Sequence, residues 1–223
     1  MDIKRNIEEI INSIPANVKL VVISKTRSAS EIMEVYNTGH RLMGENKVQE
    51  LAGKYGQLPD DIQWHMVGHL QTNKVKYIAP FVSMIHSVDS VKLLKTINKE
   101  AQKNNRIIDC LLQVHIAMEE SKFGFSENEI AGLTGVVDQE DFKGVRIRGL
   151  MGMATYTNDL NQVRTEFRTL AGLFEKAKET VFNNSESFNE LSMGMSGDYM
   201  IAVEEGSTIV RIGSLIFGER SND

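Results

Sequence analysis

Short apolar runs alternate with amphipathic stretches along this chain. In the first fourteen residues, isoleucines recur at three- and four-residue steps, which predicts a helix over 1–14 that ends before Pro15. The apolar stripe of this helix consists of Ile3, Ile7, Ile10, Ile11 and Ile14. Beyond it, eight apolar runs predict eight strands, at 18–25, 41–46, 62–68, 82–88, 107–116, 145–153, 188–195 and 208–218.

The amphipathic stretches between these runs predict helices. One lies near 28–38, where Ser28 is placed to cap the N-terminus and Gly39 to end the helix. Further helices are expected at 72–79, 90–104 and 126–137. The longest helix follows the sixth run, and its apolar face is formed by Leu160, Val163, Phe167, Leu170, Phe174 and Val181.

Several of the runs are apolar throughout rather than alternating, which is typical of parallel strands covered by helices. Eight strand–helix units, with no linker rich in Gly, Ser or Pro, favour a single (β/α)8 barrel domain over 1–223, with the helix 1–14 packed on it. The alternative is an open, doubly wound sheet. No G-x-G-x-x-G motif follows the first strand, and eight strands are enough to close a barrel, so we favour the barrel.

Composition and charge narrow the class of protein. With 223 residues, 41% hydrophobic, 25% charged and three prolines, the chain is typical of a soluble globular protein. No apolar run is long enough to span a membrane, and the N-terminus lacks the apolar segment of a secretory signal, so we expect a cytoplasmic location. A net charge of −5 without a dense Lys/Arg block argues against nucleic acid as a partner, although it does not exclude small anions.

Two further features concern assembly and redox chemistry. The exposed faces of the predicted helices are charged, which favours a monomer. The single cysteine, Cys110, lies inside an apolar run and cannot form an internal disulfide. We interpret it as a small core residue, with a catalytic thiol as the alternative.

In a barrel of this kind the active site lies at the C-terminal ends of the strands and in the loops that follow them. The first strand ends on Lys25, which by itself would be an ordinary surface charge. Reading all strand ends in this way gives the candidates Lys25, Asn46, His69, Ser87, Asp89, His115, Met153, Tyr156, Ser196, Arg211, Gly213 and Ser214.

The loops after strands seven and eight are the usual phosphate site of phosphate-binding barrels. Here they read SMGMSGD and RIGSLIFG, and each combines glycine with a serine near the start of the next helix. Glycine lets the backbone approach a ligand, and free N–H groups and a hydroxyl can then meet at an anion. For either loop alone, Ser196 as a helix cap or Gly213 as a turn residue explains the pattern equally well, but the two loops together favour phosphate.

A phosphate site opposite Lys25 limits the classes of ligand that this site could bind. A lysine whose pKa is lowered reacts with carbonyl groups to form a Schiff base, and two ligand classes fit: a sugar phosphate and pyridoxal 5′-phosphate. Arg211 lies two residues before Gly213, so both face the barrel interior. Arg211 could contact a pyridine nitrogen, bind the phosphate directly, or pair with a core carboxylate such as Asp89, and the residues alone leave these roles open.

Eight segments, in order, resemble the YggS/PROSC family of pyridoxal phosphate homeostasis proteins. They are VVISKT, GENKVQE, WHMVGHLQTNK, SVDS, EESKFGF, RGLMGM, LSMGMSGDYMIAVEEGSTIVRIG and IFGER. The resemblance covers about residues 18–220. It implies one barrel like the N-terminal domain of alanine racemase, carrying pyridoxal 5′-phosphate as an aldimine on Lys25.

The resemblance also implies roles for other residues. The phosphate is expected against Ser196, Gly213 and Ser214, and the pyridine nitrogen against Arg211. The ring and its O3′ are expected in an environment formed by Asn46, Met66, Ser87 and Met153. The chain departs from the family pattern at three positions: His115 stands where asparagine is common, Ser214 where threonine is frequent, and Gly197 where a second polar residue is common.

Members of the family resemble carriers or buffers of the cofactor, which act in vitamin B6 homeostasis and affect amino-acid balance indirectly. The expected partners are therefore pyridoxal phosphate itself and pyridoxal-phosphate-dependent apoenzymes or enzymes of the B6 pathway. A metal site at His65, His69 and His115 is also conceivable, but no carboxylate stands at ligand spacing, so we expect no metal.

We expect no catalytic turnover beyond weak side activity, for a physical reason. An arginine is always cationic and only donates hydrogen bonds, so Arg211 cannot keep a pyridine nitrogen protonated, and the cofactor is then a weak electron sink. Racemases with this arginine have a second acid–base group from another domain, and this chain ends at Asp223, just after the barrel closes. Two alternatives remain: a weak pyridoxal-phosphate-dependent amino-acid racemase or decarboxylase, and a Schiff-base sugar-phosphate aldolase that uses Lys25 without a cofactor.

Overall fold

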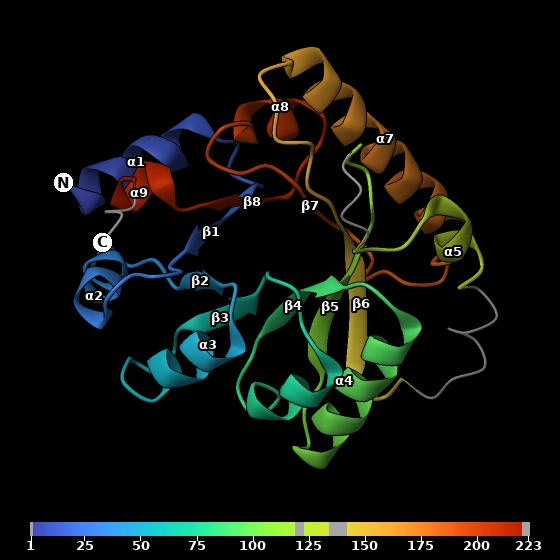
Figure 1. Ribbon diagram of the computed structural model, residues 1–223, viewed down its shortest axis with the longest axis horizontal. Coiled ribbons are helices and arrows are strands. Elements are labelled where there is room, and N and C mark those ends of the chain that lie inside the picture. The colour runs from blue at the N-terminus through green and yellow to red at the C-terminus, as the bar shows by residue number, and fades with distance from the viewer. Residues whose placement is uncertain (1, 119–122, 134–141, 220–223) are drawn as a thin grey trace.

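The computed structural model describes residues 2–118, 123–133 and 142–219. Eight parallel strands follow one another around a closed barrel in sequence order (Figure 1). They are β1 (Lys19–Ile23), β2 (Leu42–Glu45), β3 (Gln63–Met66), β4 (Met84–Val88), β5 (Ile108–Gln113), β6 (Val145–Met151), β7 (Glu190–Ser192) and β8 (Ile209–Ile212). The barrel closes where β1 pairs with β8, from Lys19 opposite Ile209 to Val22 opposite Ile212. The predicted barrel is confirmed, and the open sheet is excluded.

Helices lie outside this barrel (Figure 1). They are α1 (Ile3–Ser13), α2 (Ala29–Asn37), α3 (Val48–Tyr55), α4 (Val91–Lys103), α5 (Glu127–Ala131), α7 (Leu160–Glu179), α8 (Tyr199–Glu204) and α9 (Ser214–Phe217), with a 3-10 helix, η1 (Thr72–Tyr77). As predicted, Ser28 caps α2, and Glu31 completes a capping box by accepting the N–H of Ser28. Gly39, at φ +92°, turns the chain after this helix.

Two predicted helices differ from the observed ones. The stretch from Thr72 forms a 3-10 helix, with bonds from Lys74 N to Gln71 O and from Ile78 N to Val75 O. The helix expected at 126–137 ends at Ala131, where Gly132 follows. Its last expected residues, 134–137, lie outside the described residues, as do residues 119–122 of the EESKFGF segment.

The predicted apolar faces are largely correct, with errors at their edges. In α1 the residues Ile3, Ile7 and Ile10 are buried, but Ile11 is 47% exposed. At the helical rotation of about 100° per residue, Ile11 lies about 80° around the helix from Ile3, at the edge of the stripe. In the longest helix Leu160 is exposed, and Val181 is buried beyond the helix end.

The main core lies between the sheet and the helices, and a smaller apolar cluster fills part of the barrel interior. The smaller cluster consists of Val21, Met84, Leu111, Met151 and Ile209. Cys110 belongs to the main core and is fully buried, and burial raises the pKa of its thiol, which is the core role expected for it. No helix among the described residues combines the length and the apolar character that crossing a membrane requires.

Gly149 shows how tightly β6 approaches β7. Its φ is +153°, and the register between β5 and β6 shifts just before it. A Cβ atom at this position would lie 1.8 Å from the carbonyl oxygen of Glu190. Only glycine therefore allows β6 to pair with both neighbours here.

Candidate functional site

A cavity of about 300 Å³ lies at the C-terminal end of the barrel. It is lined by Ile23, Lys25, Arg27, Tyr156, Met195, Ser196, Gly197, Asp198, Arg211, Gly213, Ser214 and Gly218. These residues come from the end of β1 and the chain after it, from the loop after β6, and from the segments around the ends of β7 and β8. The structure therefore brings Lys25, Arg211 and both predicted phosphate loops to one cavity.

A second cavity, of about 200 Å³, adjoins the first and shares Tyr156 and Met195 with it. It is lined by Gln113, Val114, His115, Ile116, Ala117, Phe123, Met153, Ala154, Tyr156 and Met195. Met153 and His115 therefore lie beside the cavity that contains Lys25 and do not line it.

The other expected ring neighbours do not line either cavity. Met66 is fully buried in the main core, because it alternates along β3 with His65 and so faces the helices. The hydroxyl of Ser87 donates to the carbonyl oxygen of Gly68 at 2.6 Å. The backbone of Asn46 packs against the same glycine, where an added Cβ would lie 2.3 Å from the oxygen of Asn46.

Arg211 is 4% exposed and reaches across the barrel interior. Its Nη1 donates to Oγ of Ser192 at 2.6 Å, and its Nη2 donates to the carbonyl oxygen of Gly152 at 3.0 Å. Burial lowers the pKa of Arg211 to about 10, while the negative charge of Asp198 acts in the opposite direction. The guanidinium therefore stays cationic at neutral pH. The pair with Asp89 that the sequence left open is not formed, since Asp89 lies 3.2 Å from Nδ1 of His69.

Behind Arg211, a hydrogen-bonded chain of polar side chains occupies another part of the barrel interior. Nδ1 of His86 lies 3.0 Å from Oγ of Ser192, and Nε2 of His86 lies 2.9 Å from Nδ1 of His65. Burial lowers the pKa of His65 to about 3 and also lowers the pKa of His86, so both rings are neutral near pH 7. Ser192 and His86 were not among the sequence candidates, although each is a polar residue within an apolar run.

The two glycine-serine loops meet at the cavity. The N–H of Gly213 donates to Oγ of Ser196 at 3.4 Å, and Oδ1 of Asp198 accepts the N–H of Met195 at 2.6 Å. A Cβ at Gly213 would lie 2.9 Å from the carbonyl oxygen of Ile23, so this loop packs directly against the end of β1. Within the described part of the chain, the backbone N–H groups of Gly197 and Ser214 donate to no acceptor.

Two charged residues of the cavity were not among the sequence candidates. Arg27 lines it while donating to the carbonyl oxygen of Gly218 at 2.6 Å, and its side chain is largely buried. Asp198 lines the cavity too. Burial raises the pKa of its carboxyl group, while the N–H of Met195 and the charge of Arg211 act in the opposite direction. Their positions in the sequence could have identified both residues, because Arg27 follows Lys25 by two residues and Asp198 belongs to the SMGMSGD loop.

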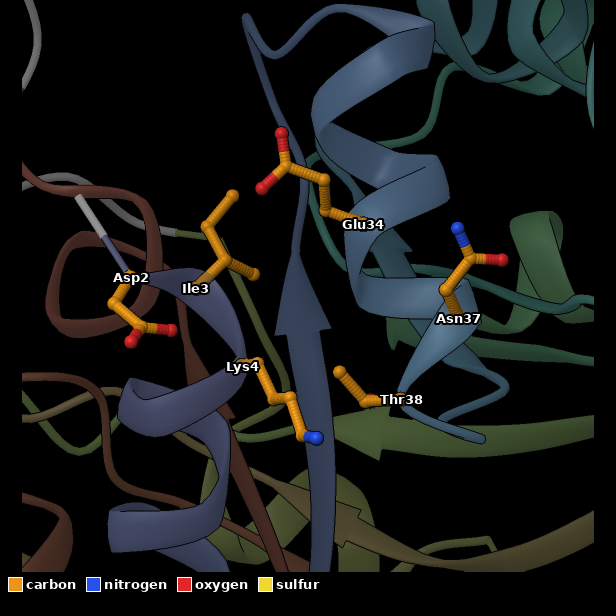
Figure 2. A pocket seen from close by; sticks show the side chains of 6 residues that line it. All are labelled: Asp2, Ile3, Lys4, Glu34, Asn37 and Thr38. Carbon is orange, nitrogen blue, oxygen red and sulfur yellow. The ribbon is translucent and has the colours of Figure 1, made fainter.

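A larger cavity, of about 550 Å³, lies on the outside of the barrel between α1 and α2. Figure 2 shows its six lining side chains, whose polar ends point in different directions. These side chains are Asp2, Ile3, Lys4, Glu34, Asn37 and Thr38. Since they come from two outer helices and no strand end contributes, we assign the functional site to the cavity at Lys25.

The described residues contain no group of three or more His, Cys, Asp or Glu side chains that could hold a metal ion. The histidines considered for such a site have other neighbours. His65 contacts His86, while the ring of His69 packs on Phe123 with centroids 4.2 Å apart.

Comparison with known proteins agrees with this architecture. The family described as alanine racemase, N-terminal domain, matches residues 1–221. A pyridoxal phosphate homeostasis protein of Aquifex aeolicus is 42% identical over 203 residues, which are 91% of this chain and 87% of that protein. Another, of Schizosaccharomyces pombe, is 36% identical over 210 residues, 93% of this chain and 86% of that protein.

Solved structures give the same result. PipY of Synechococcus elongatus PCC7942, with PLP bound, has a TM-score of 0.88 at 31% identity, covering 97% of this chain and 100% of PipY. An alanine racemase of Clostridium difficile 630 has a TM-score of 0.76 at 12% identity and shares the fold, covering 100% of this chain and 61% of the racemase chain.

Proposed function

This chain belongs to the family of pyridoxal phosphate homeostasis proteins, and from that premise we propose that it binds pyridoxal phosphate through Lys25 and acts as a carrier or buffer of this cofactor. The observation that carries the proposal is the single cavity shared by Lys25, Arg211 and the two loops at Ser196 and Gly213. Such a cavity offers an amine, a cation and phosphate-binding groups within the space of one small ligand.

The residues present fit this cofactor. The hydroxyls of Ser196 and Ser214 suit a phosphate, as do the N–H groups of Gly197 and Ser214, which have no acceptor among the described residues; Arg27 is a nearby positive charge. Arg211 has five N–H donors and gives only two to Ser192 and Gly152, so others remain for a ring nitrogen. When bound, pyridoxal phosphate supplies an aldehyde that condenses with a primary amine and releases one water.

We assign the roles as follows. The amine of Lys25 holds the aldehyde, the loops at Ser196 and at Gly213 and Ser214 hold the phosphate, and Arg211 faces the pyridine nitrogen. We propose Met153, from the adjoining cavity, and Asn46 as neighbours of the ring and its hydroxyl. Ser87 acts through its bond to Gly68, and Met66 supports β3 from the core.

We further propose that the protein holds the cofactor without using it for catalysis. The support is Arg211: a buried guanidinium that can only donate does not stabilise a protonated pyridine nitrogen, which the strongest electron sinks require. A carrier exchanges its cofactor with apoenzymes, so we place this protein in the cytoplasm, where pyridoxal-phosphate-dependent apoenzymes or B6-pathway enzymes would be its partners.

The test is reconstitution of Lys25→Ala with pyridoxal phosphate. Wild-type protein should develop a visible-range absorption band and a borohydride-trapped adduct on Lys25, and Lys25→Ala should show neither. Lys92→Ala, which removes a lysine on the exposed side of α4, should behave as wild type. An unchanged band in Lys25→Ala would place the cofactor on another lysine.

The same preparations separate the two alternatives. Substantial turnover of an amino-acid panel by the loaded protein would identify a racemase or a decarboxylase. Borohydride trapping that requires a sugar phosphate, in a colourless protein without added cofactor, would identify an aldolase.

A further inference from the structure

Lys25 stands between two residues whose backbones are held by a largely buried ionic cluster. The cluster consists of Lys54, Glu45 and Glu50, and we name it the Lys54 cluster. On one side of Lys25, Nζ of Lys54 donates to the carbonyl oxygen of Ser24 at 2.7 Å. On the other side, the N–H of Thr26 donates to Oε1 of Glu50 at 2.5 Å. The chain is therefore fixed immediately before and immediately after Lys25.

The hydrogen bonds of Lys54 are fully used within this arrangement. A lysine ammonium has three N–H donors, and here they meet three acceptors. The acceptors are the oxygen of Ser24 at 2.7 Å, Oε1 of Glu45 at 2.6 Å and Oε1 of Glu50 at 2.6 Å. Ser24 is bound a second time, because its hydroxyl donates to Glu45 at 2.6 Å. Glu45 is fully buried and Lys54 is 9% exposed, so water has little access to the contact between these two side chains.

The turn that carries Lys25 is itself unfavourable. Residues 24–27 form a four-residue turn in which the N–H of Arg27 donates to the oxygen of Ser24 at 3.0 Å. Thr26 occupies its third position with φ +65°, where glycine or asparagine is normally preferred and a β-branched residue is strained. Such a conformation persists only where surrounding contacts hold it, and the bond from Thr26 to Glu50 is one of them.

We propose that Lys54 is a positioning residue for Lys25: through Ser24, Glu45 and Glu50 it holds the turn that aims the Lys25 amine into the cavity. This inference rests on the proposed function, because its readout is the ligand held by Lys25. It goes beyond that function in assigning the orientation of the amine to a cluster outside the cavity lining. If the Lys54 cluster only stabilised the fold, its loss would affect ligands that react with the Lys25 amine and ligands that do not to the same extent.

The experiment compares Lys54→Met with Lys19→Met, using two probes on the full chain. Lys19 pairs with buried Glu190 at the opposite end of β1, so its substitution also breaks an ion pair but far from the turn. The probes are pyridoxal phosphate, followed by its absorption band, and pyridoxine phosphate, which lacks the aldehyde, followed by competition. After borohydride reduction, peptide mapping identifies the labelled lysine.

We expect Lys54→Met to lower the affinity for pyridoxal phosphate by about tenfold or more, since the amine is no longer preorganised. Borohydride labelling should spread from Lys25 to other lysines, while the affinity for pyridoxine phosphate should stay within about twofold of wild type. Lys19→Met should leave both affinities and the labelling pattern unchanged.

Two results would overturn the inference: unchanged labelling of Lys25 with unchanged affinity, or an equal loss of affinity for both probes. If Lys54→Met does not fold, Glu50→Ala replaces it, because Glu50 is partly exposed and its loss frees the N–H of Thr26. We expect Glu50→Ala to weaken the binding of pyridoxal phosphate but not of pyridoxine phosphate. The two results named above would overturn the inference for this variant as well. Wild-type protein that is not labelled at Lys25 overturns the proposed function and this inference together, whereas normal wild-type labelling with unchanged variants overturns the inference alone.

Discussion

Arg211 donates a hydrogen bond to the hydroxyl of Ser192 at 2.6 Å, inside the barrel. An arginine only donates, so the hydroxyl accepts this bond, and Nδ1 of His86 lies 3.0 Å from the same oxygen. Nε2 of His86 in turn lies 2.9 Å from Nδ1 of His65. The cation in the cavity is thus held by a hydrogen-bonded chain of three buried side chains.

Replacing Ser192 by alanine should lower the free energy of unfolding by about 1–3 kcal/mol, because a guanidinium N–H and a ring nitrogen lose their partner out of reach of water. Urea unfolding measures the effect. The matched control is Ser207→Ala, another buried serine, whose hydroxyl donates to main-chain carbonyls such as that of Met193 at 2.8 Å. Its cost should be smaller, about 0.5–1.5 kcal/mol, and an equal or larger cost for Ser207→Ala would contradict the importance given to Ser192.

Acid should destabilise the protein through its interior histidines. The pKa of His65 is lowered from 6.5 to about 3 in the folded state by burial, so the unfolded chain binds more protons between these values. Stability is therefore fully present above pH 6.5 and is lost as pH falls. From pH 6.5 to 5 the loss from His65 should be about 2 kcal/mol, and His86, whose pKa is also lowered, adds to it.

The measurement is the free energy of unfolding in urea at several pH values for wild type and His65→Gln. The variant has one fewer group that gains a proton on unfolding, so its stability should depend less steeply on pH over this range. Parallel curves for the two proteins would show that His65 does not contribute to acid sensitivity.

Two glycines should respond to alanine in opposite directions. In Gly149→Ala the new Cβ would lie 1.8 Å from the oxygen of Glu190 at a positive φ, so strands β6 and β7 must separate and stability should fall by about 3 kcal/mol or more. Gly172 lies inside α7, and a Cβ there would meet no atom within 4 Å beyond its chain neighbours and the backbone of its own helix, so Gly172→Ala should stabilise the helix by about 0.5–1 kcal/mol. Thermal unfolding compares them, and a tolerated Gly149→Ala would be inconsistent with the close approach of the strands.

Substituting Arg211 by lysine should weaken the binding of pyridoxal phosphate by about tenfold or more, although the positive charge is kept. A single ammonium cannot bond Ser192 and the oxygen of Gly152 together while also presenting a donor to the cavity. Titration of the absorption band gives the affinity. Arg168→Lys, on the exposed side of α7 where the arginine pairs with Glu205, should bind as wild type, and equal affinities for all three proteins would remove Arg211 from the site.

The sequence by itself determined the strand order, the barrel and the cavity positions of Lys25, Arg211, Ser196 and Gly213. Each of these follows from local information. Apolar periodicity locates the strands, and in a parallel barrel every strand carries its C-terminal end to the same face, so residues after the strands meet without any knowledge of side-chain packing.

Only the tertiary structure decided which side chains contact one another in the barrel interior and around the strand ends. Met66 points into the core because the pairing register places His65 inside the barrel, and a pattern of apolar letters does not reveal which of two neighbours faces inward. The bond between His86 and Ser192 joins residues 106 positions apart, and that between Lys54 and Ser24 joins residues 30 apart. Such contacts depend on closure and register together, so they form only when the whole barrel is assembled.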